Sequence, residues 1–153
     1  MMKVFLDTNI FAEYIFRRER YSDVERLFVA ITANQIEAYT SNGTFYTLAY
    51  ITERMLKQQG YRRPELISQM RAILVSLLNL VHVIGLDQTG LTSATMNESF
   101  TDIEDSFQYQ CALIGQCDKL ITINIDDFRG ADQTHLEVFT PRQFNESFLN
   151  SSY

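Results

Sequence analysis

Several features that mark particular protein classes are scarce in this chain of 153 residues. Only two cysteines occur, Cys111 and Cys117, and no histidine lies near them. Their spacing matches neither a zinc site nor a disulfide framework. We therefore expect both to be buried, reduced thiols in a cytoplasmic protein.

Long apolar runs are also missing. The stretch from Ala72 to Ile84 is interrupted by a serine, an asparagine and a histidine, whereas a membrane-spanning helix needs about 20 apolar residues. The N-terminal apolar stretch stops at Asp7, too soon for a signal peptide. We predict that the chain has no membrane segment.

Positive charge is in deficit, because 13 lysines and arginines face 19 acidic residues, for a net charge of −6. Broad binding to nucleic acid depends on neutralising phosphate, so this balance argues against it. A local basic rim around an acidic, metal-filled centre remains compatible with the composition. Apolar residues make up 46% of the chain, which is ordinary for a globular protein. The length suits one domain over residues 1–153.

Strand and helix patterns alternate along the chain. Short apolar runs predict strands at 3–6, 37–40, 81–84, 120–123 and 138–139. Helical spacing of apolar residues follows each of the first three runs, and a final helix is predicted from residue 140. Strands separated by helices imply parallel crossovers. We predict an α/β fold with three α/β/α layers and a parallel sheet of four to five strands.

Three helix starts carry the pattern of a capping box, in which a Ser or Thr precedes a Glu or Gln by three residues. These are Ser22 to Glu25, Thr101 to Glu104 and Thr140 to Gln143.

Three acidic residues stand at strand ends or helix starts. Asp7 follows the first strand, Asp105 lies in the first turn of the helix near residue 101, and Asp127 follows the fourth strand. Ligands of parallel sheets bind beyond the carboxyl ends of the strands. Carboxylates gathered there would repel one another unless a hard divalent cation bound them. This pattern favours a metal site.

Each acid also has a structural interpretation. Asp105, with Asp102 and Glu104, would complement a helix dipole. Asp127 would cap a turn. Asp7 would be the N-cap of the helix that follows, a role open to Thr8 or Asn9 as well.

The chain resembles PIN-domain proteins, especially the toxin ribonucleases of bacterial toxin–antitoxin pairs. The resemblance covers nearly the whole chain in order and spacing, and rests on four segments: 4–10, 102–108, 121–128 and 138–144. It implies metal positions at Asp7, Asp105 and Asp127, a Thr-x-Asn turn at Thr122 and Asn124, and supporting roles for Thr8, Asn9 and Asp102. It also implies Mg²⁺ or Mn²⁺, an RNA substrate, an antitoxin partner, a homodimer and a cytoplasmic location.

The chain departs from that family at two positions. Ile123 stands in the Thr-x-Asn turn where the family often has Arg. Thr47 stands six residues after Ser41, where many members have a Glu. A missing carboxylate lowers the negative charge of the site and so its expected metal affinity.

Three classes of function remain open. The first is a metal-dependent endoribonuclease, in which Asp7 and Asp105 hold the ion while Asp127 and Asn124 position ligands or water. The second is a PIN-fold interaction module that Thr47 has weakened as a catalyst. The third is a phosphoryl-transfer domain with Asp7 as nucleophile, but Asn9 stands where haloacid-dehalogenase-like enzymes place a second Asp. Two basic groups either steer RNA phosphate or form solvated helix surfaces: Arg17, Arg18 and Arg20, and Arg54, Lys57, Arg62 and Arg63.

Overall fold

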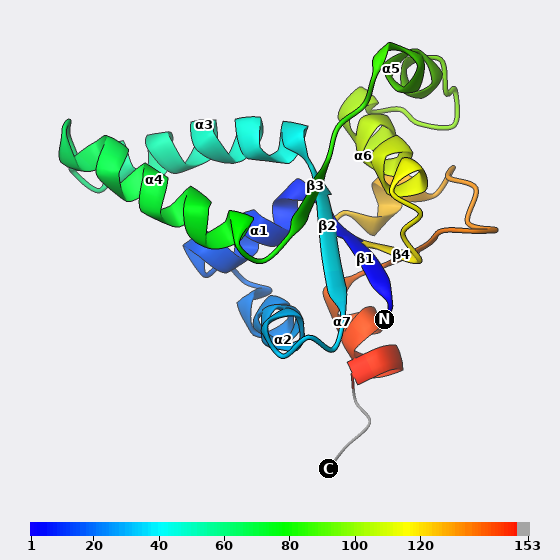
Figure 1. Cartoon of the computed structure of the whole chain (residues 1–153), viewed down its shortest axis with the longest axis horizontal. Coiled ribbons are helices and arrows are strands. Elements are labelled where there is room, and N and C mark those ends of the chain that lie inside the picture. The colour runs from blue at the N-terminus through cyan, green and yellow to red at the C-terminus, as the bar shows by residue number, and fades with distance from the viewer. Residues whose placement is uncertain (150–153) are drawn as a thin grey trace.

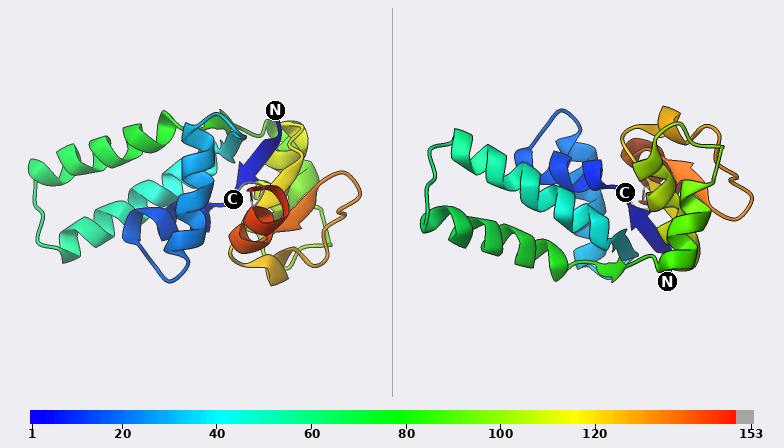
Figure 2. Two further views of the ribbon diagram at one scale, coloured as in Figure 1. Left: turned by 90° about the horizontal axis from the view of Figure 1, so that it is seen from below. Right: turned by 90° about the horizontal axis from the view of Figure 1, so that it is seen from above.

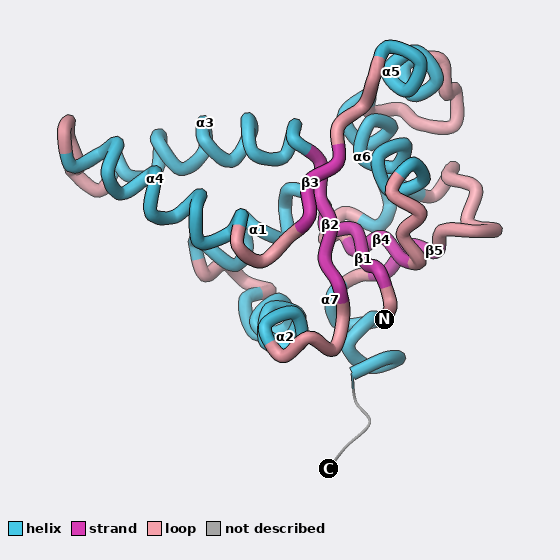
Figure 3. The backbone as a smooth tube through the Cα atoms, viewed as in Figure 1, coloured by secondary structure: helices cyan, strands magenta, loops and turns pink. Residues whose placement is uncertain are grey.

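A sheet of parallel strands forms the centre of the molecule. The computed structural model describes residues 1–149, so the last four residues of the predicted domain lie outside the described part. Within it, the strands are β1 (Lys3–Leu6), β2 (Glu37–Ser41), β3 (His82–Ile84), β4 (Lys119–Ile121) and β5 (Glu137–Phe139), in the order β3-β2-β1-β4-β5. Every neighbouring pair is parallel, and Figure 3 shows the strands side by side. The predicted parallel α/β sheet is confirmed.

Helices connect the strands and cover the sheet (Figure 1). They are α1 (Thr8–Phe16), α2 (Tyr21–Thr32), α3 (Asn42–Gln58), α4 (Glu65–Leu78), α5 (Gln88–Thr95), α6 (Ile103–Ile114) and α7 (Pro141–Phe144). A 3₁₀ turn, η1 (Ile125–Phe128), follows β4, and a π-helical turn, η2 (Asn145–Leu149), follows α7.

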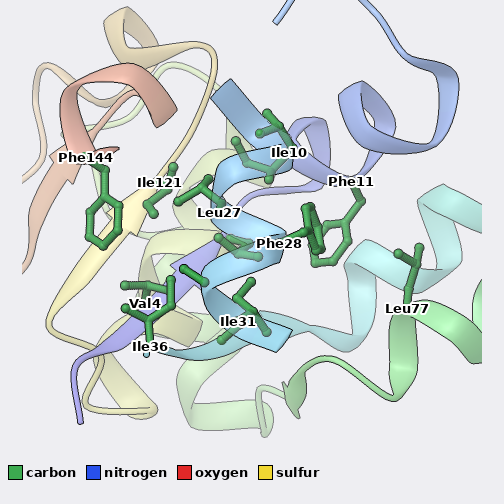
Figure 4. Close-up of a cluster of buried hydrophobic side chains, with 14 of the residues drawn as sticks. Val4, Ile10, Phe11, Leu27, Phe28, Ile31, Ile36, Leu77, Ile121 and Phe144 are labelled. Atoms are coloured by element: carbon green, nitrogen blue, oxygen red, sulfur yellow. The ribbon is translucent and has the colours of Figure 1, made fainter. Parts of the chain in front are cut away.

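The central strand buries side chains on both faces of the sheet, as a fully covered parallel strand does. Val4 and Leu6 point into a core shared with α1, α2 and α7, whereas Phe5 points into a second core shared with α6. Figure 4 shows Val4 and Ile121 in the first core, together with Leu27, Phe28 and Ile31 of α2. These two cores fill the spaces between the sheet and the helix layers on its two faces, as the predicted three-layer arrangement requires.

Helices α3 and α4 extend away from the sheet as a long pair, which both views of Figure 2 show. They pack against each other, and a small core of Leu56, Leu66 and Met70 joins them near their far end. The near half of α3 stays against α1, so its first turns border the carboxyl edge of the sheet.

Two of the three predicted capping boxes are wrong. Helix α2 begins at Tyr21, one residue before Ser22, and its N-cap, Arg20, makes no side-chain cap. In α6 the cap is Asp102 rather than Thr101, because a carboxylate competes well for free backbone N–H groups. The box from Thr140 to Gln143 is confirmed with both of its hydrogen bonds.

The structure bears on the expectations for the two cysteines and for membrane segments. Both thiols are free and buried, and burial raises the pKa of Cys111 to about 11 and that of Cys117 to about 12. Over residues 1–149, we find no helix with the length and apolarity needed to cross a bilayer.

Candidate functional site

The site lies at the carboxyl edge of the sheet, where the strand order reverses. The chain builds β2 and β3 on one side of β1 and then places β4 on the other side. Asp7 follows β1, and its amide donates to the Ile121 carbonyl of β4 at 3.0 Å. Such a switch point leaves a crevice beyond the strand ends, where ligands of parallel sheets bind. Asp7 therefore stands where the strand-end argument expected a site.

The Asp7 carboxylate is almost fully buried, with 5% of its surface exposed. It is the N-cap of α1, so the structural interpretation of this residue is confirmed. Four groups donate to it: Thr8 N (2.8 Å) and Gln108 Nε2 (3.2 Å) to Oδ1, and Thr122 Oγ1 (2.8 Å) and Asn9 Nδ2 (3.4 Å) to Oδ2. Burial raises its pKa most, the charge of Asp127 adds to this, and the hydrogen bonds oppose it. The hydrogen bonds therefore hold the Asp7 carboxylate in one orientation, at a position where burial disfavours its negative charge.

The Thr-x-Asn turn is fastened to Asp7 from the other side of the switch point. Thr122 Oγ1 accepts from Asn9 Nδ2 at 3.2 Å and from the Asn124 amide at 3.1 Å. Asn9 Oδ1 in turn accepts from the Ile123 amide at 3.1 Å. Thr122 and Asn9 thus act as supports, while the exposed Asn124 lines the cleft.

The start of α6 brings further carboxylates to the crevice. Asp102 caps the helix by accepting from the amides of Glu104 (2.9 Å) and Asp105 (3.3 Å). Among the described residues, nothing donates to the buried Oδ2 atom of Asp105. Burial, and to a smaller extent the charges of Asp7, Asp102, Asp127 and Glu104, together raise the pKa of Asp105 to about 7. A role at the helix start alone does not explain why this oxygen is buried without a partner and why the pKa of Asp105 is raised.

Asp127 reaches the same crevice from η1. Its side chain is exposed, yet its charge raises the pKa of both Asp7 and Asp105. The fully buried Phe128 anchors this turn in the second core, the one shared with α6 (the α6-side core). The three acids named from the sequence therefore line one cleft.

Sequence reasoning missed Gln108, although it lies in a motif that was recognised. It is buried on α6, one turn after Asp105, and so shares a face with it. Its Nε2 donates to Asp7 Oδ1, Thr8 Oγ1 (3.2 Å) and Thr44 Oγ1 (3.0 Å), and its Oε1 accepts from Ser41 Oγ. The i, i+3 spacing from Asp105 was the signal that could have found it.

These residues line an open cleft of about 490 Å³. Thr47, the position where many family members have a Glu, is among the lining residues. Its side chain places a neutral hydroxyl there instead of a carboxylate. The remaining charged lining groups are Asp7, Asp102, Glu104, Asp105, Asp127 and Arg18.

The donor set fits a hard cation that keeps much of its water. Over residues 1–149, no three His, Cys, Asp or Glu side chains lie close enough to form a closed metal cage. Mg²⁺, however, is commonly held by one or two carboxylates and several waters. The unpartnered Asp105 Oδ2 and the mutual repulsion of Asp7, Asp105 and Asp127 are what such an ion would relieve. The metal role of these three acids stays a prediction.

The raised pKa of Asp105 predicts that the stability of the fold depends on pH. Between about pH 4 and pH 7 the folded protein binds this proton more tightly than the unfolded chain, whose ordinary value is 3.8. The stabilisation is thus complete below that value and lost as the pH rises toward 7. In EDTA at pH 7.5, we expect Asp105→Asn to be more stable than the wild type by about 1–2 kcal/mol, the full shift being reduced by solvent screening.

Urea unfolding at pH 5 and at pH 7.5 measures this effect, with the exposed Glu98→Gln as control. The gain from Asp105→Asn should shrink at the lower pH. An equal change at both pH values would contradict the raised pKa of Asp105.

Comparisons with known proteins bear on the family and the fold of the chain. A family model described as "PIN domain" matches residues 3–126. A structure of VapBC2 from Rickettsia felis bound to a DNA fragment from their promoter is similar, with a TM-score of 0.63 and 16% identity over 91% of this chain and 98% of that one. A toxin–antitoxin complex from Klebsiella pneumoniae is similar with a TM-score of 0.61 and 19% identity, covering 90% and 97%. Among curated proteins, no sequence matches the chain.

Proposed function

The chain belongs to the PIN domain family, and from this premise we propose that it is a metal-dependent endoribonuclease. The observation that carries the proposal is the charge arrangement of the cleft. Burial raises the pKa of Asp7 and of Asp105 there, the charge of Asp127 raises both further, and one oxygen of Asp105 is buried without a partner among the described residues. Carboxylates held in repulsion are typical of a site that binds a cation.

We assign roles to the residues as follows. Asp7 and Asp105 hold Mg²⁺ or Mn²⁺, with Asp127 as a third ligand position. Asn124 and Asp127 orient ligands or water at the exposed side of the cleft. Thr8, Asn9, Thr122 and Gln108 fix the direction of the Asp7 carboxylate, and Asp102 fixes the first turn of α6.

The reaction proposed is hydrolysis of an RNA phosphodiester. An oxygen of water forms a bond to phosphorus, the bond to the leaving oxygen breaks, and that oxygen takes up a proton. A bound divalent ion supplies activation of the water and neutralises charge on the phosphate. A proton and an ion compete for the Asp105 carboxylate, so we expect the affinity for the ion to fall as the pH drops below about 7.

RNA cleavage with and without a divalent ion tests the proposal directly. Purified protein is incubated with total RNA in Mg²⁺, in Mn²⁺ and in EDTA, and the products are separated by size. We expect cleavage in either ion and none in EDTA. Absence of cleavage in both ions would refute the nuclease assignment.

A second candidate is a PIN-fold interaction module with weakened catalysis, which the neutral Thr47 in the cleft favours. Titration with Mg²⁺ and Mn²⁺ by calorimetry distinguishes the two. If neither ion binds at millimolar concentration, the interaction module is the better assignment.

Replacing Thr47 with the missing carboxylate gives a prediction for this position. We expect Thr47→Glu to bind Mg²⁺ about 10-fold more tightly, since one more charge near an ion contributes on the order of 1 kcal/mol or more. Tyr50→Glu is the matched control, because that side chain lies on the same helix, is 64% exposed and does not line the cleft. A similar gain in both variants would mean that position 47 is not beside the ion.

We further propose that the chain is the cytoplasmic toxin of a toxin–antitoxin pair. The support is that the similar structures described above come from complexes of that kind. An antitoxin covering the acidic cleft and a homodimer of this chain are the partners that the family resemblance implies. Co-expression with the neighbouring gene product, followed by chromatography with light scattering, tests both.

A further inference from the structure

Charge is distributed unevenly in the cleft. All five acidic lining residues come from the end of β1, the start of α6 and η1: Asp7, Asp102, Glu104, Asp105 and Asp127. The lining residues from α1 and α3, two helices that pack together, carry no acid. Arg18, just after α1, is the basic residue among the described lining residues. The cleft therefore combines an acidic side with one cation on the α1–α3 side.

The local structure leaves the Arg18 guanidinium available to a ligand. Its amide donates to the Glu13 carbonyl at 3.2 Å, which ties the backbone to the end of α1. The guanidinium carbon lies 5.1 Å from the ring centroid of Phe16. Within residues 1–149, no carboxylate forms an ion pair with Arg18, although Arg129 and Arg142 each have one. The Arg18 guanidinium thus packs on the Phe16 ring, and no carboxylate of the described residues neutralises its charge.

Thr47 and Ile51 keep this side of the cleft free of negative charge. Both line the cleft from α3. A Glu at position 47 would put a carboxylate into the same cleft as Arg18 and compete for its guanidinium. With Thr in its place, the positive charge of Arg18 faces the cleft without that competitor.

We propose that Arg18 binds a phosphate of the RNA strand next to the phosphate that is hydrolysed. The proposal rests on the proposed nuclease function. A guanidinium matches phosphate oxygens in a bidentate manner and keeps its charge at all relevant pH values. RNA entering a cleft with five carboxylates meets repulsion that the metal site relieves only locally, and Arg18 supplies a second positive charge in the same cleft. The acids thus hold the ion while Arg18 holds the strand.

The experiment compares Arg18→Ala, Arg18→Lys and the control Arg20→Ala with the wild type. Arg20 is exposed nearby but does not line the cleft. Binding of a fluorescein-labelled single-stranded RNA of mixed sequence, about 20 nucleotides long, is followed by anisotropy in Mg²⁺ at several salt concentrations. Steady-state cleavage of the same RNA gives KM and kcat.

We expect Arg18→Ala to weaken RNA binding about 10-fold, as loss of a charged hydrogen-bonding partner does. The slope of log affinity against log salt should fall by about 0.7, the value for one phosphate contact on a single strand. KM should rise with little change in kcat. Arg18→Lys keeps the charge but not the bidentate geometry, so it should restore the salt slope and recover only part of the affinity. Arg20→Ala should resemble the wild type, and Mg²⁺ affinity in the absence of RNA should not fall in any variant.

The outcomes separate this proposal from the nuclease assignment. If the RNA binds in an Arg18-dependent manner but is not cleaved, the phosphate contact stands and the nuclease function fails. If Arg18→Ala binds RNA as the wild type does, or if Arg20→Ala is equally impaired, the phosphate contact is overturned whether or not cleavage occurs.

Discussion

Asp7→Asn should slow Mg²⁺-dependent RNA cleavage by about 1,000-fold or more, the scale on which one electrostatic contact to a developing charge acts. The substitution keeps the size of the side chain but removes its negative charge. Asp7 is the most buried of the cleft acids and the only one fixed from both sides of the switch point, by Gln108 and by Thr122. An amide has one acceptor oxygen where the carboxylate has two, so it is a poorer ligand for a hard cation.

The fold should survive this change. Burial raises the pKa of Asp7, which means that its charge costs folding free energy rather than contributing it. The new Nδ2 group would face Thr122 Oγ1, which already accepts from Asn9 and Asn124, so a hydrogen bond is lost and offsets part of this gain. Thermal unfolding should therefore show a melting temperature close to that of the wild type.

Cleavage, metal titration and unfolding are to be measured on the same preparation, with the exposed Asp118→Asn as control. We expect the control to cleave normally. Equal cleavage by wild type and Asp7→Asn would remove Asp7 from the site and with it the proposed mechanism.

The largest loss of stability is expected from Phe128→Ala, at about 3–5 kcal/mol. Phe128 is fully buried in the α6-side core and meets Phe100 edge to face, with ring centroids 5.7 Å apart. Removing the ring leaves a cavity that the short turn η1 cannot close, because neighbouring strands and α6 fix its surroundings.

Urea unfolding measures this loss, with Phe148→Ala as the matched control. Phe148 is 37% exposed although it also contacts other rings, so we expect it to lose less than half as much. Comparable losses at both positions would show that Phe128 is not an anchor of the core.

Metal titration of Phe128→Ala adds a second readout. Because Phe128 directly follows Asp127, releasing the turn should weaken Mg²⁺ binding even under conditions in which the variant is folded. Unchanged affinity would mean that Asp127 does not depend on this anchor.

Local sequence patterns were sufficient for the layers of the fold. Apolar runs such as Val4 to Leu6 are too short for helices and are separated by amphipathic segments, which leaves a parallel α/β sheet as the arrangement that buries them. The helix starts were harder. Ser22 fits a capping box in sequence, yet α2 begins at Tyr21, because the end of a helix depends on where its apolar face meets the core as well as on its cap.

For the candidate site, too, some features follow from local sequence and others only from the tertiary structure. The sequence by itself determined that Asp7, Asp105 and Asp127 belong at one edge of the sheet, because strand ends and helix starts are local properties and the crossovers are of one hand. Only the tertiary structure decided that Gln108 and Thr122 fasten Asp7 from two sides, that Thr47 lines the cleft, and that Arg18 alone among the basic residues named from the sequence lies in it. The two contacts to Asp7 join residues that are 101 and 115 positions apart, and at that separation contacts are set by how the layers pack rather than by neighbours in the chain.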